Sequence, residues 1–324
     1  LGVVFNRLGK LDEANNCLEL ALKINPSYAE AYSNRGNLMT DFARYEEALN
    51  DYQKAYKLQP DIDYMLGNIL NTKMYICIWD ELTEQIDELL LKINKDDKVI
   101  GPFAALTITD DPALQKKVTE IYVNDKFPIS NSLRKIGRYP KHKKIRIGYF
   151  SADFREHPVS TLTAELYEIH DRSHFEVYAF SYGPDTKDKM NLRIKAGVDH
   201  FYDVRMMSHK DVVLLSRSLE IDIAIDLGGY TQHSRAEVLL MSAAPIQVNY
   251  LGYSGTMGSE FMDYIIADNI IIPEESKHYY SEKITYLPNS FMVNDTKIEV
   301  SKRSFTRQKA GLPSIGFVFC CFNN

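Results

Sequence analysis

The chain has 324 residues, of which 45% are hydrophobic and 25% are charged, and its formal net charge is −6. These fractions are typical of globular proteins and exclude a disordered chain or a collagen-like fibre. No apolar run approaches the roughly 20 residues that span a bilayer, which excludes a membrane bundle. The acidic balance argues against broad nucleic-acid binding, because contact with a phosphate backbone requires a basic face.

The cysteines and the two ends of the chain add two expectations. No CxxC pair occurs among the four cysteines, which are Cys17, Cys77, Cys320 and Cys321. We therefore predict neither a disulfide framework nor a zinc site, and we expect a reducing compartment, the cytoplasm. The chain opens with Leu1 rather than Met and stops at Asn324 directly after a strand-like run, so we expect a fragment cut at both ends.

An internal repeat occupies residues 1–60. Pro26 and Pro60 lie 34 residues apart, and each closes a helical pattern, because proline lacks the N–H that would continue a helix. The period matches the tetratricopeptide pattern of paired helices. Two unrelated amphipathic helix pairs are the alternative. The same offset aligns small residues where helices would cross, namely Gly2 with Gly36, Ala14 with Ala48, and Ala21 with Ala55, and it aligns Leu18 with Tyr52.

The repeat pattern weakens after residue 60. Residues 61–94 keep a helical period without the aligned small residues, and residues 111–123 predict one more helix. We assign residues 61–127 to a degenerate repeat and helical cap, since a worn terminal repeat often closes a solenoid. Residues 128–143, which contain Pro128 and Pro140, are predicted as a linker.

The hydrophobic period changes from residue 144 onward. Short β-branched and aromatic runs alternate with helical stretches, which is typical of a parallel sheet covered on both faces. Residues 144–312 are therefore predicted as a doubly wound α/β lobe, and residues 313–324 as the start of a second one. The predicted strands are Ile145–Ser151, Phe175–Tyr182, His200–Val204, Ile221–Leu227, Ile246–Leu251, Tyr264–Ala267, Ile284–Leu287 and Gly316–Phe322. The predicted helices are Ser160–His170, Lys187–Gly197, His209–Leu219 and Arg235–Ser242.

Chemistry is expected where strands end, because ligands bind at the carboxyl ends of the strands in such sheets. The first strand is followed by Asp153 and His157 in one short loop, with Ser160 placed to cap the next helix. An Asp and a His this close can share a proton, polarise a hydroxyl or bind a phosphate. A turn-capping Asp153 and a solvated His157 are the structural alternative.

Two glycine-rich loops follow later strands. Residues 226–231 combine two glycines, which let the backbone approach a ligand, with the hydroxyls of Tyr230 and Thr231. Residues 251–258 contain three glycines with Ser and Thr, whose N–H groups could cradle a sugar or a phosphate. Residues 251–258 lack the Gly-Lys-Ser/Thr ending of a Walker loop and do not form a GxGxxG fingerprint. The remaining histidines lack metal-ligand spacing, so we predict no metal.

Taken together, these motifs resemble one enzyme family. The repeats lead into Ser151-Ala152-Asp153-Phe154 and His157-Pro158-Val159-Ser160, followed by Gly229-Tyr230-Thr231, Ala244-Pro245-Ile246-Gln247, Leu251-Gly252-Tyr253-Ser254-Gly255-Thr256 and Phe261-Met262-Asp263-Tyr264. Their order and spacing are similar to the protein O-GlcNAc transferase family, including its bacterial and SPINDLY-type relatives. The resemblance implies a GT-B fold of two Rossmann-like lobes. It also implies inverting, metal-independent transfer of a sugar, expected to be N-acetylglucosamine from UDP-GlcNAc, to Ser or Thr of acceptor proteins guided by the repeats.

The resemblance also implies roles for single residues. Asp153 and His157 match the family's catalytic segment, in which the His lies beside the donor sugar and phosphate. The residues implied in donor-sugar binding are Pro158, Val159, Leu251, Gly252 and Asn324. The residues implied on the acceptor side of the cleft are Tyr230, Thr231 and Tyr253.

Three functional interpretations stay open from the residues. The first is a protein O-glycosyltransferase; the second transfers a sugar to Asn, as cytoplasmic N-glucosyltransferases do; the third is a repeat scaffold with an inactive lobe. The intact segments around Asp153 and Gly252 favour the first. The identity of the sugar and of the general base stays open. Because most nucleotide contacts of the family belong to the second lobe, residues 1–324 alone are expected to be nearly inactive.

Overall fold

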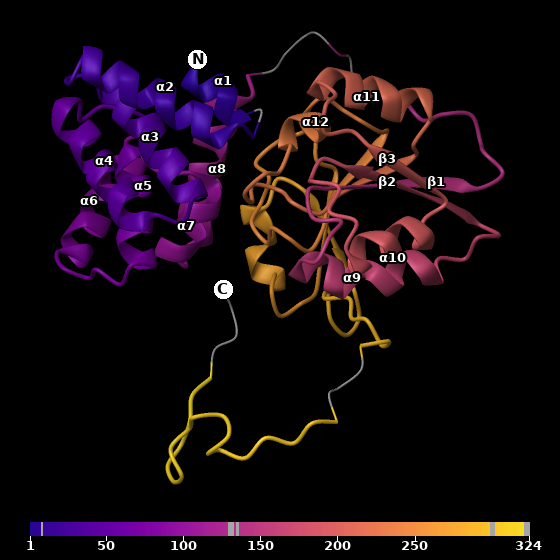
Figure 1. Ribbon diagram of the computed structural model, residues 1–324. Coiled ribbons are helices and arrows are strands. Elements are labelled where there is room, and N and C mark those ends of the chain that lie inside the picture. Colours follow the sequence, from indigo (N-terminus) through magenta and orange to yellow (C-terminus); the bar gives the residue numbers. More distant parts are fainter. Residues whose placement is uncertain (8, 129–132, 134–135, 299–301, 321–324) are drawn as a thin grey trace.

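The computed structural model describes residues 1–7, 9–128, 133, 136–298 and 302–320. A helical solenoid lies beside an α/β lobe, and residues 302–320 extend away from the lobe (Figure 1). No helix in this described part is long and apolar enough to cross a bilayer. The helices of the solenoid are α1 (Gly2–Arg7), α2 (Leu11–Ile24), α3 (Ala29–Asp41), α4 (Tyr45–Leu58), α5 (Met65–Tyr75), α6 (Leu82–Asn94), α7 (Pro102–Ile108) and α8 (Pro112–Lys126).

The small residues of the repeat lie where helices cross, as predicted. A Cβ on Gly36 would lie 2.5 Å from the Tyr52 ring, and a Cβ on Gly2 would lie 2.9 Å from the Leu18 side chain. The same pair of positions therefore makes the same contact in both repeats. Helices α2 and α4 end two residues before Pro26 and Pro60, which confirms the helix ends.

The lobe contains a seven-stranded parallel sheet in the order β3-β2-β1-β4-β5-β6-β7. Helices α9 and α10 cover one face, and α11 and α12 cover the other (Figure 1). The strands are β1 (Ile145–Ser151), β2 (Phe175–Ser181), β3 (His200–Asp203), β4 (Ile223–Asp226), β5 (Ile246–Asn249), β6 (Tyr264–Ala267) and β7 (Lys283–Tyr286). The helices are α9 (Pro158–Ile169), α10 (Lys189–Gly197), α11 (His209–Ser218) and α12 (Ala236–Leu240), with a 3₁₀ turn at Glu274–Tyr279.

The predicted strand Gly316–Phe322 is wrong for its described part. Residues 316–320 form no strand, and Phe317 and Phe319 are 84% and 91% exposed. An apolar run becomes a strand only when a neighbouring strand pairs with its backbone, and the described residues offer none here. Phe322 and the predicted donor residue Asn324 lie outside the described residues, as does part of the predicted linker.

The order of the strands creates a switch point between β1 and β4. From β1 the chain proceeds to β2 and β3 on one side, and from β4 it proceeds to β5, β6 and β7 on the other. Because all strands are parallel, the loops that leave β1, β4 and β5 share one edge of the sheet. Open α/β sheets bind ligands at such a point.

Candidate active site

The three loops predicted to carry the chemistry leave the sheet along this edge. The loop after β4 begins at Leu227, whose N–H donates to the Phe150 carbonyl of β1 at 3.1 Å. A Cβ on Gly252, in the loop after β5, would collide with the Leu227 carbonyl oxygen. The two glycine-rich loops therefore touch through their backbones, which requires glycine at residue 252.

Asp153 and His157 lie together at the start of α9. His157 Nε2 is 3.7 Å from Asp153 Oδ1, and His157 Nδ1 accepts the Val159 N–H at 3.3 Å. His157 is thus the residue that caps the helix. The predicted cap, Ser160, is wrong, because its hydroxyl turns back and donates to the Asp153 carbonyl.

The environment of His157 favours the neutral imidazole. Burial lowers the pKa of His157, the Asp153 carboxylate acts in the opposite direction, and the Arg155 guanidinium lowers it further. Because Nδ1 accepts a hydrogen bond, the single proton of the neutral ring belongs on Nε2. His157 can therefore donate a hydrogen bond from Nε2 to an oxygen of a bound ligand.

Pro158 and Val159 form the first turn of the helix that His157 caps. Pro158 is exposed, and Val159 is half-buried against the core between the sheet and α9. On the facing loop, Leu251 has a φ of 74°, a conformation that costs energy for a branched side chain. Leu251 and Gly252 are both half-buried.

Tyr230, Thr231 and Tyr253 hold the loops in shape. The Tyr230 hydroxyl donates to the Met257 carbonyl at 2.7 Å, and the Thr231 hydroxyl donates to the Gly228 carbonyl at 2.7 Å. The Tyr230 ring meets the Tyr253 ring edge to face at 5.4 Å. Burial raises the pKa of both tyrosines, so both stay neutral. Their lining of an acceptor cleft stays a prediction.

Comparison with known proteins assigns the family. Residues 118–304, more than half of the chain, match glycosyl transferase family 41, and residues 2–40 and 29–62 match tetratricopeptide repeats. The chain belongs to glycosyl transferase family 41. The resemblance drawn from the motifs is thereby confirmed.

Three similar proteins illustrate the relationship of this family 41 chain to others. A probable UDP-N-acetylglucosamine–peptide N-acetylglucosaminyltransferase SEC of Arabidopsis thaliana is 30% identical over 79% of this chain and 28% of its own length. The UDP-N-acetylglucosamine–peptide N-acetylglucosaminyltransferase of Caenorhabditis elegans is 33% identical over 53% of this chain and 14% of its own length. The chain thus spans less than a third of these relatives. A mutant of the Thermobaculum terrenum O-GlcNAc transferase matches with a TM-score of 0.69 and 24% identity, over 90% of this chain and 56% of that one.

The structural match confirms the predicted fold of the family 41 chain: a repeat solenoid followed by a parallel α/β lobe of GT-B type. The domain boundaries and the roles of single residues stay predictions. Among the described residues, no group of three or more His, Cys, Asp or Glu side chains could hold a metal ion.

The sequence did not reveal two residues that contact and hold the glycine-rich loops. The Tyr122 ring of α8 meets the Tyr230 ring edge to face at 5.5 Å, so the solenoid touches the glycine-rich loop directly. Glu282, just before β7, is buried and accepts from the Thr256 hydroxyl at 2.6 Å and the Met257 N–H at 2.5 Å. No local pattern links either residue to loops tens of residues away.

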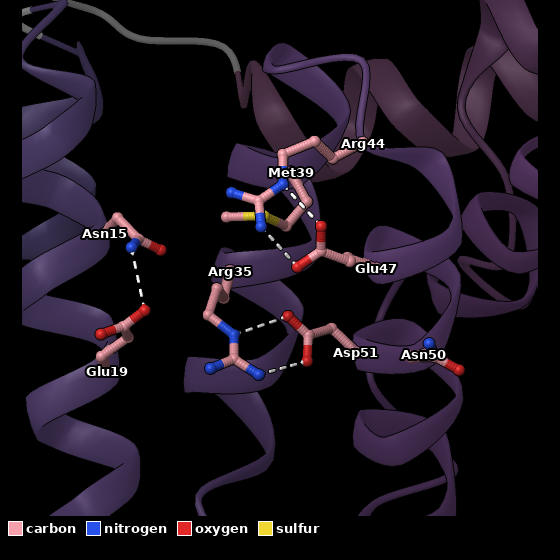
Figure 2. Close-up of a pocket in the computed structure, with 8 residues that line it drawn as sticks. All are labelled: Asn15, Glu19, Arg35, Met39, Arg44, Glu47, Asn50 and Asp51. Atoms are coloured by element: carbon pink, nitrogen blue, oxygen red, sulfur yellow. Dashed lines mark hydrogen bonds and ion pairs between the residues drawn. The ribbon is translucent and has the colours of Figure 1, made fainter.

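A polar hollow of about 250 Å³ lies on the solenoid, where α2, α3 and α4 supply its lining (Figure 2). Arg35 of α3 donates twice to Asp51 of α4, at 2.7 Å each, and Arg44 donates twice to Glu47 at 2.6 Å each. Both arginines are therefore neutralised by carboxylates. The hollow is lined by Asn15, Glu19, Arg35, Met39, Arg44, Glu47, Asn50 and Asp51.

Proposed function

We propose that this chain is part of a protein O-glycosyltransferase that moves N-acetylglucosamine from UDP-GlcNAc to Ser or Thr of proteins, with inversion and without a metal. Its membership of family 41 supports the proposal, and so do the peptide N-acetylglucosaminyltransferase names of its relatives. The single observation that carries it is the Asp153–His157 pair at the first turn of α9, on the ligand-binding edge of the sheet.

The proposed reaction forms one bond and breaks one bond at the anomeric carbon. The acceptor oxygen attacks and its proton passes to the departing diphosphate, while the bond between the anomeric carbon and the diphosphate breaks and the diphosphate takes up the electron pair. His157 would donate from Nε2 to the donor sugar or phosphate. The N-terminus of α9 carries a positive partial charge and would stabilise the same developing charge. Asp153, 3.7 Å from Nε2, would orient the ring.

The two glycine-rich loops would form the rest of the site. Leu251 and Gly252 would contact the donor sugar, together with Pro158 and Val159 on the opposite side. Tyr230, Thr231 and Tyr253 would shape the acceptor side. The role of Tyr230 and Thr231 would be positional, because their hydroxyls are already bonded to carbonyls.

The solenoid would bind the acceptor proteins. Its polar hollow presents Asn15 and Asn50, whose amides can both donate and accept, and Glu19, which accepts only from Asn15 among the described residues. We expect the protein in the cytoplasm, where free thiols such as those of Cys17 and Cys77 persist.

The test uses the full-length protein, a panel of UDP- and GDP-sugars, EDTA and a protein extract, with glycosylated residues identified by mass spectrometry. We expect transfer of N-acetylglucosamine to Ser or Thr, and we expect His157→Ala to reduce kcat by about 100-fold or more, since charge stabilisation at the leaving group is lost. The matched control is His174→Ala, because the His174 side chain is 73% exposed and pairs with Asp171.

Each outcome decides between the interpretations. Transfer to Asn would replace the proposal by an N-glucosyltransferase. Absence of transfer from every donor, with acceptor peptides still bound to the repeats, would favour the scaffold. Loss of transfer on addition of EDTA would contradict the metal-independent mechanism.

A further inference from the structure

A buried pair of polar side chains lies beneath the two glycine-rich loops. Asp226 ends β4 and Asn249 ends β5, and the two residues are partners in the parallel register. Register partners project from the same face of the sheet on strands about 4.8 Å apart, so the side chains are neighbours. Asp226 is 1% exposed and Asn249 is 0% exposed.

One oxygen of each side chain has no hydrogen-bond partner. Asp226 Oδ1 accepts the Gly228 N–H at 3.0 Å, whereas Oδ2 is buried and unpaired. Asn249 Nδ2 donates to the Tyr253 carbonyl at 3.0 Å and the Gly255 carbonyl at 3.3 Å. These two bonds fix the orientation of the amide and leave Asn249 Oδ1 buried and unpaired. A buried hydrogen-bond acceptor normally has a donor. A proton on Asp226 Oδ2 would turn this oxygen into a donor to Asn249 Oδ1, so that both oxygens would have a partner.

We propose that Asp226 is a positioning residue of the active site, whose protonated carboxyl donates a hydrogen bond from Oδ2 to Asn249 Oδ1. Asp226 holds the loop of residues 227–235, and Asn249 holds the loop of residues 250–258. This hydrogen bond therefore joins the loop on the side of the acceptor protein to the loop on the side of the donor sugar. When the carboxyl releases its proton to water, two acceptors face each other and the link is lost. The positional role rests on the proposed function, because it acts on these two loops.

The surroundings of Asp226 allow the carboxyl to titrate in the accessible range. Burial raises the pKa of Asp226 to about 6, although the N–H groups of Gly228 and Gly229 lower it. Burial raises the pKa of Tyr182, which directly follows β2, and that of Tyr230. The Asp226 charge raises the pKa of both tyrosines further. Both tyrosines therefore stay neutral while Asp226 titrates.

The charged groups nearby are engaged elsewhere. Arg235 donates to the Val204 carbonyl at 3.1 Å and the Met207 carbonyl at 2.8 Å. The charge of Arg235 lowers the pKa of Tyr182, and the charge of Glu237 raises it. The charge of Glu282 raises the pKa of Tyr230, and the Glu282 carboxylate accepts hydrogen bonds from the loop after β5. Within the described residues, no Lys or Arg bonds to Asp226, so burial dominates its titration.

The variant Asp226→Asn tests the positional role in the full-length enzyme. Its amide can accept the Gly228 N–H and donate permanently to Asn249, so it mimics the protonated acid. We expect kcat/KM of the wild type to fall about fivefold or more as pH rises through about 6, a size typical of coupling between two sites. The variant should lack this fall and should keep only the titrations that it shares with the wild type, such as that of His157. Asp203→Asn is the control, because Asp203 ends β3 and is paired with Arg205 at the surface.

Infrared difference spectroscopy of the 324-residue chain tests the proton itself, independently of transferase activity. A protonated-carboxyl C=O band should disappear as pH rises through about 6 and should be absent in Asp226→Asn. If that variant fails to fold by circular dichroism, Asn249→Ala replaces it and should move the midpoint to lower pH, because the protonated form loses its acceptor.

The outcomes separate this inference from the proposed function. The absence of any wild-type band that is lost in Asp226→Asn would overturn the shared proton. A band present in both proteins belongs to another buried carboxyl such as Glu282, whose pKa burial also raises. A band that belongs to Asp226 without any change in the pH profile would overturn the positional role. A band that belongs to Asp226 in a protein that transfers no sugar would leave the proton in place and remove the proposed function.

Discussion

His157 serves two purposes at one position. Its Nδ1 caps α9 through the Val159 N–H, and its Nε2 faces Asp153. Sequence reasoning located the Asp153–His157 pair but assigned the cap to Ser160, because serine is the commoner capping residue. A histidine can cap only when its ring nitrogen is unprotonated, so capping and the lowered pKa of His157 support each other.

The buried carboxyl of Asp226 should affect stability as well as position. Its folded-state pKa is raised from 3.8 to about 6, so its contribution to stability is fully present below pH 3.8 and is lost as pH rises through about 6. The loss amounts to about 3 kcal/mol. Asp226→Asn should therefore show a higher free energy of unfolding in urea near pH 8, and this gain should vanish below pH 3.8.

Measurement of the unfolding free energy near pH 8 and below pH 3.8 distinguishes an effect of the Asp226 charge from an effect of side-chain packing. A gain of equal size at both would mean that the substitution acts through packing rather than through the charge.

The strands of the sheet could be predicted and their ends could not. Residues 221–227 were expected as one strand, but β4 covers only Ile223–Asp226, because the ladders to β1 and β5 both run from residue 223 to residue 226. Apolar patterning shows which segments enter a core, whereas strand ends depend on partners elsewhere in the chain. For the same reason the run after Gly316 was expected as a strand and is exposed.

The sequence likewise predicted part of the candidate site. Its three loops followed from the strand ends, because parallel strands bring their carboxyl ends to one edge. The supports from Tyr122 and Glu282 did not follow, because tertiary packing alone brings α8 and the start of β7 to these loops.

The crossing of α3 and α4 gives a prediction for a single element. Gly36→Ala should destabilise the solenoid by about 1–3 kcal/mol, because the added Cβ would lie 2.5 Å from a ring whose hydroxyl is held by Asn37 at 2.8 Å. Thermal unfolding followed by circular dichroism measures the loss. Gly137→Ala is the control, since its Cβ would meet nothing within 4 Å.

A double variant checks the cause of that loss. Leu18 fills the Tyr52 position in the first repeat, so Tyr52→Leu should relieve part of the Gly36→Ala penalty. Strictly additive losses would contradict the contact.

A chain of aromatic rings connects the solenoid to the lobe. Tyr64, ahead of α5, meets Tyr122 of α8 at 5.5 Å, Tyr122 meets Tyr230 at 5.5 Å, and Tyr230 meets Tyr253 at 5.4 Å. Lys116 of α8 adds a hydrogen bond to the His278 carbonyl at 3.1 Å. Helix α8 thus makes both ring and hydrogen-bond contacts with the lobe, and Asp41 of α3 adds a hydrogen bond from Gln232 at 3.2 Å.

Removal of the central ring should uncouple the two parts. Tyr122→Ala is expected to cost about 3 kcal/mol, because three edge contacts and the buried area are lost. Calorimetry should show solenoid and lobe unfolding together in the wild type and in separate transitions in the variant. Tyr75→Ala, which loses a stack with Tyr45 inside the solenoid, should keep one transition.

The position of this aromatic chain bears on how such proteins can diversify. The 34-residue unit lies ahead of Tyr64, whereas the rings that contact the lobe come from Tyr64 onward. Duplication or loss of a unit before residue 61 changes the reach of the solenoid and leaves these rings where they are. The length of the solenoid can therefore change by whole repeats while these ring contacts stay in place. Asp41 of the repeat unit also accepts a hydrogen bond from Gln232 at 3.2 Å, so we expect the last unit before Tyr64 to be retained.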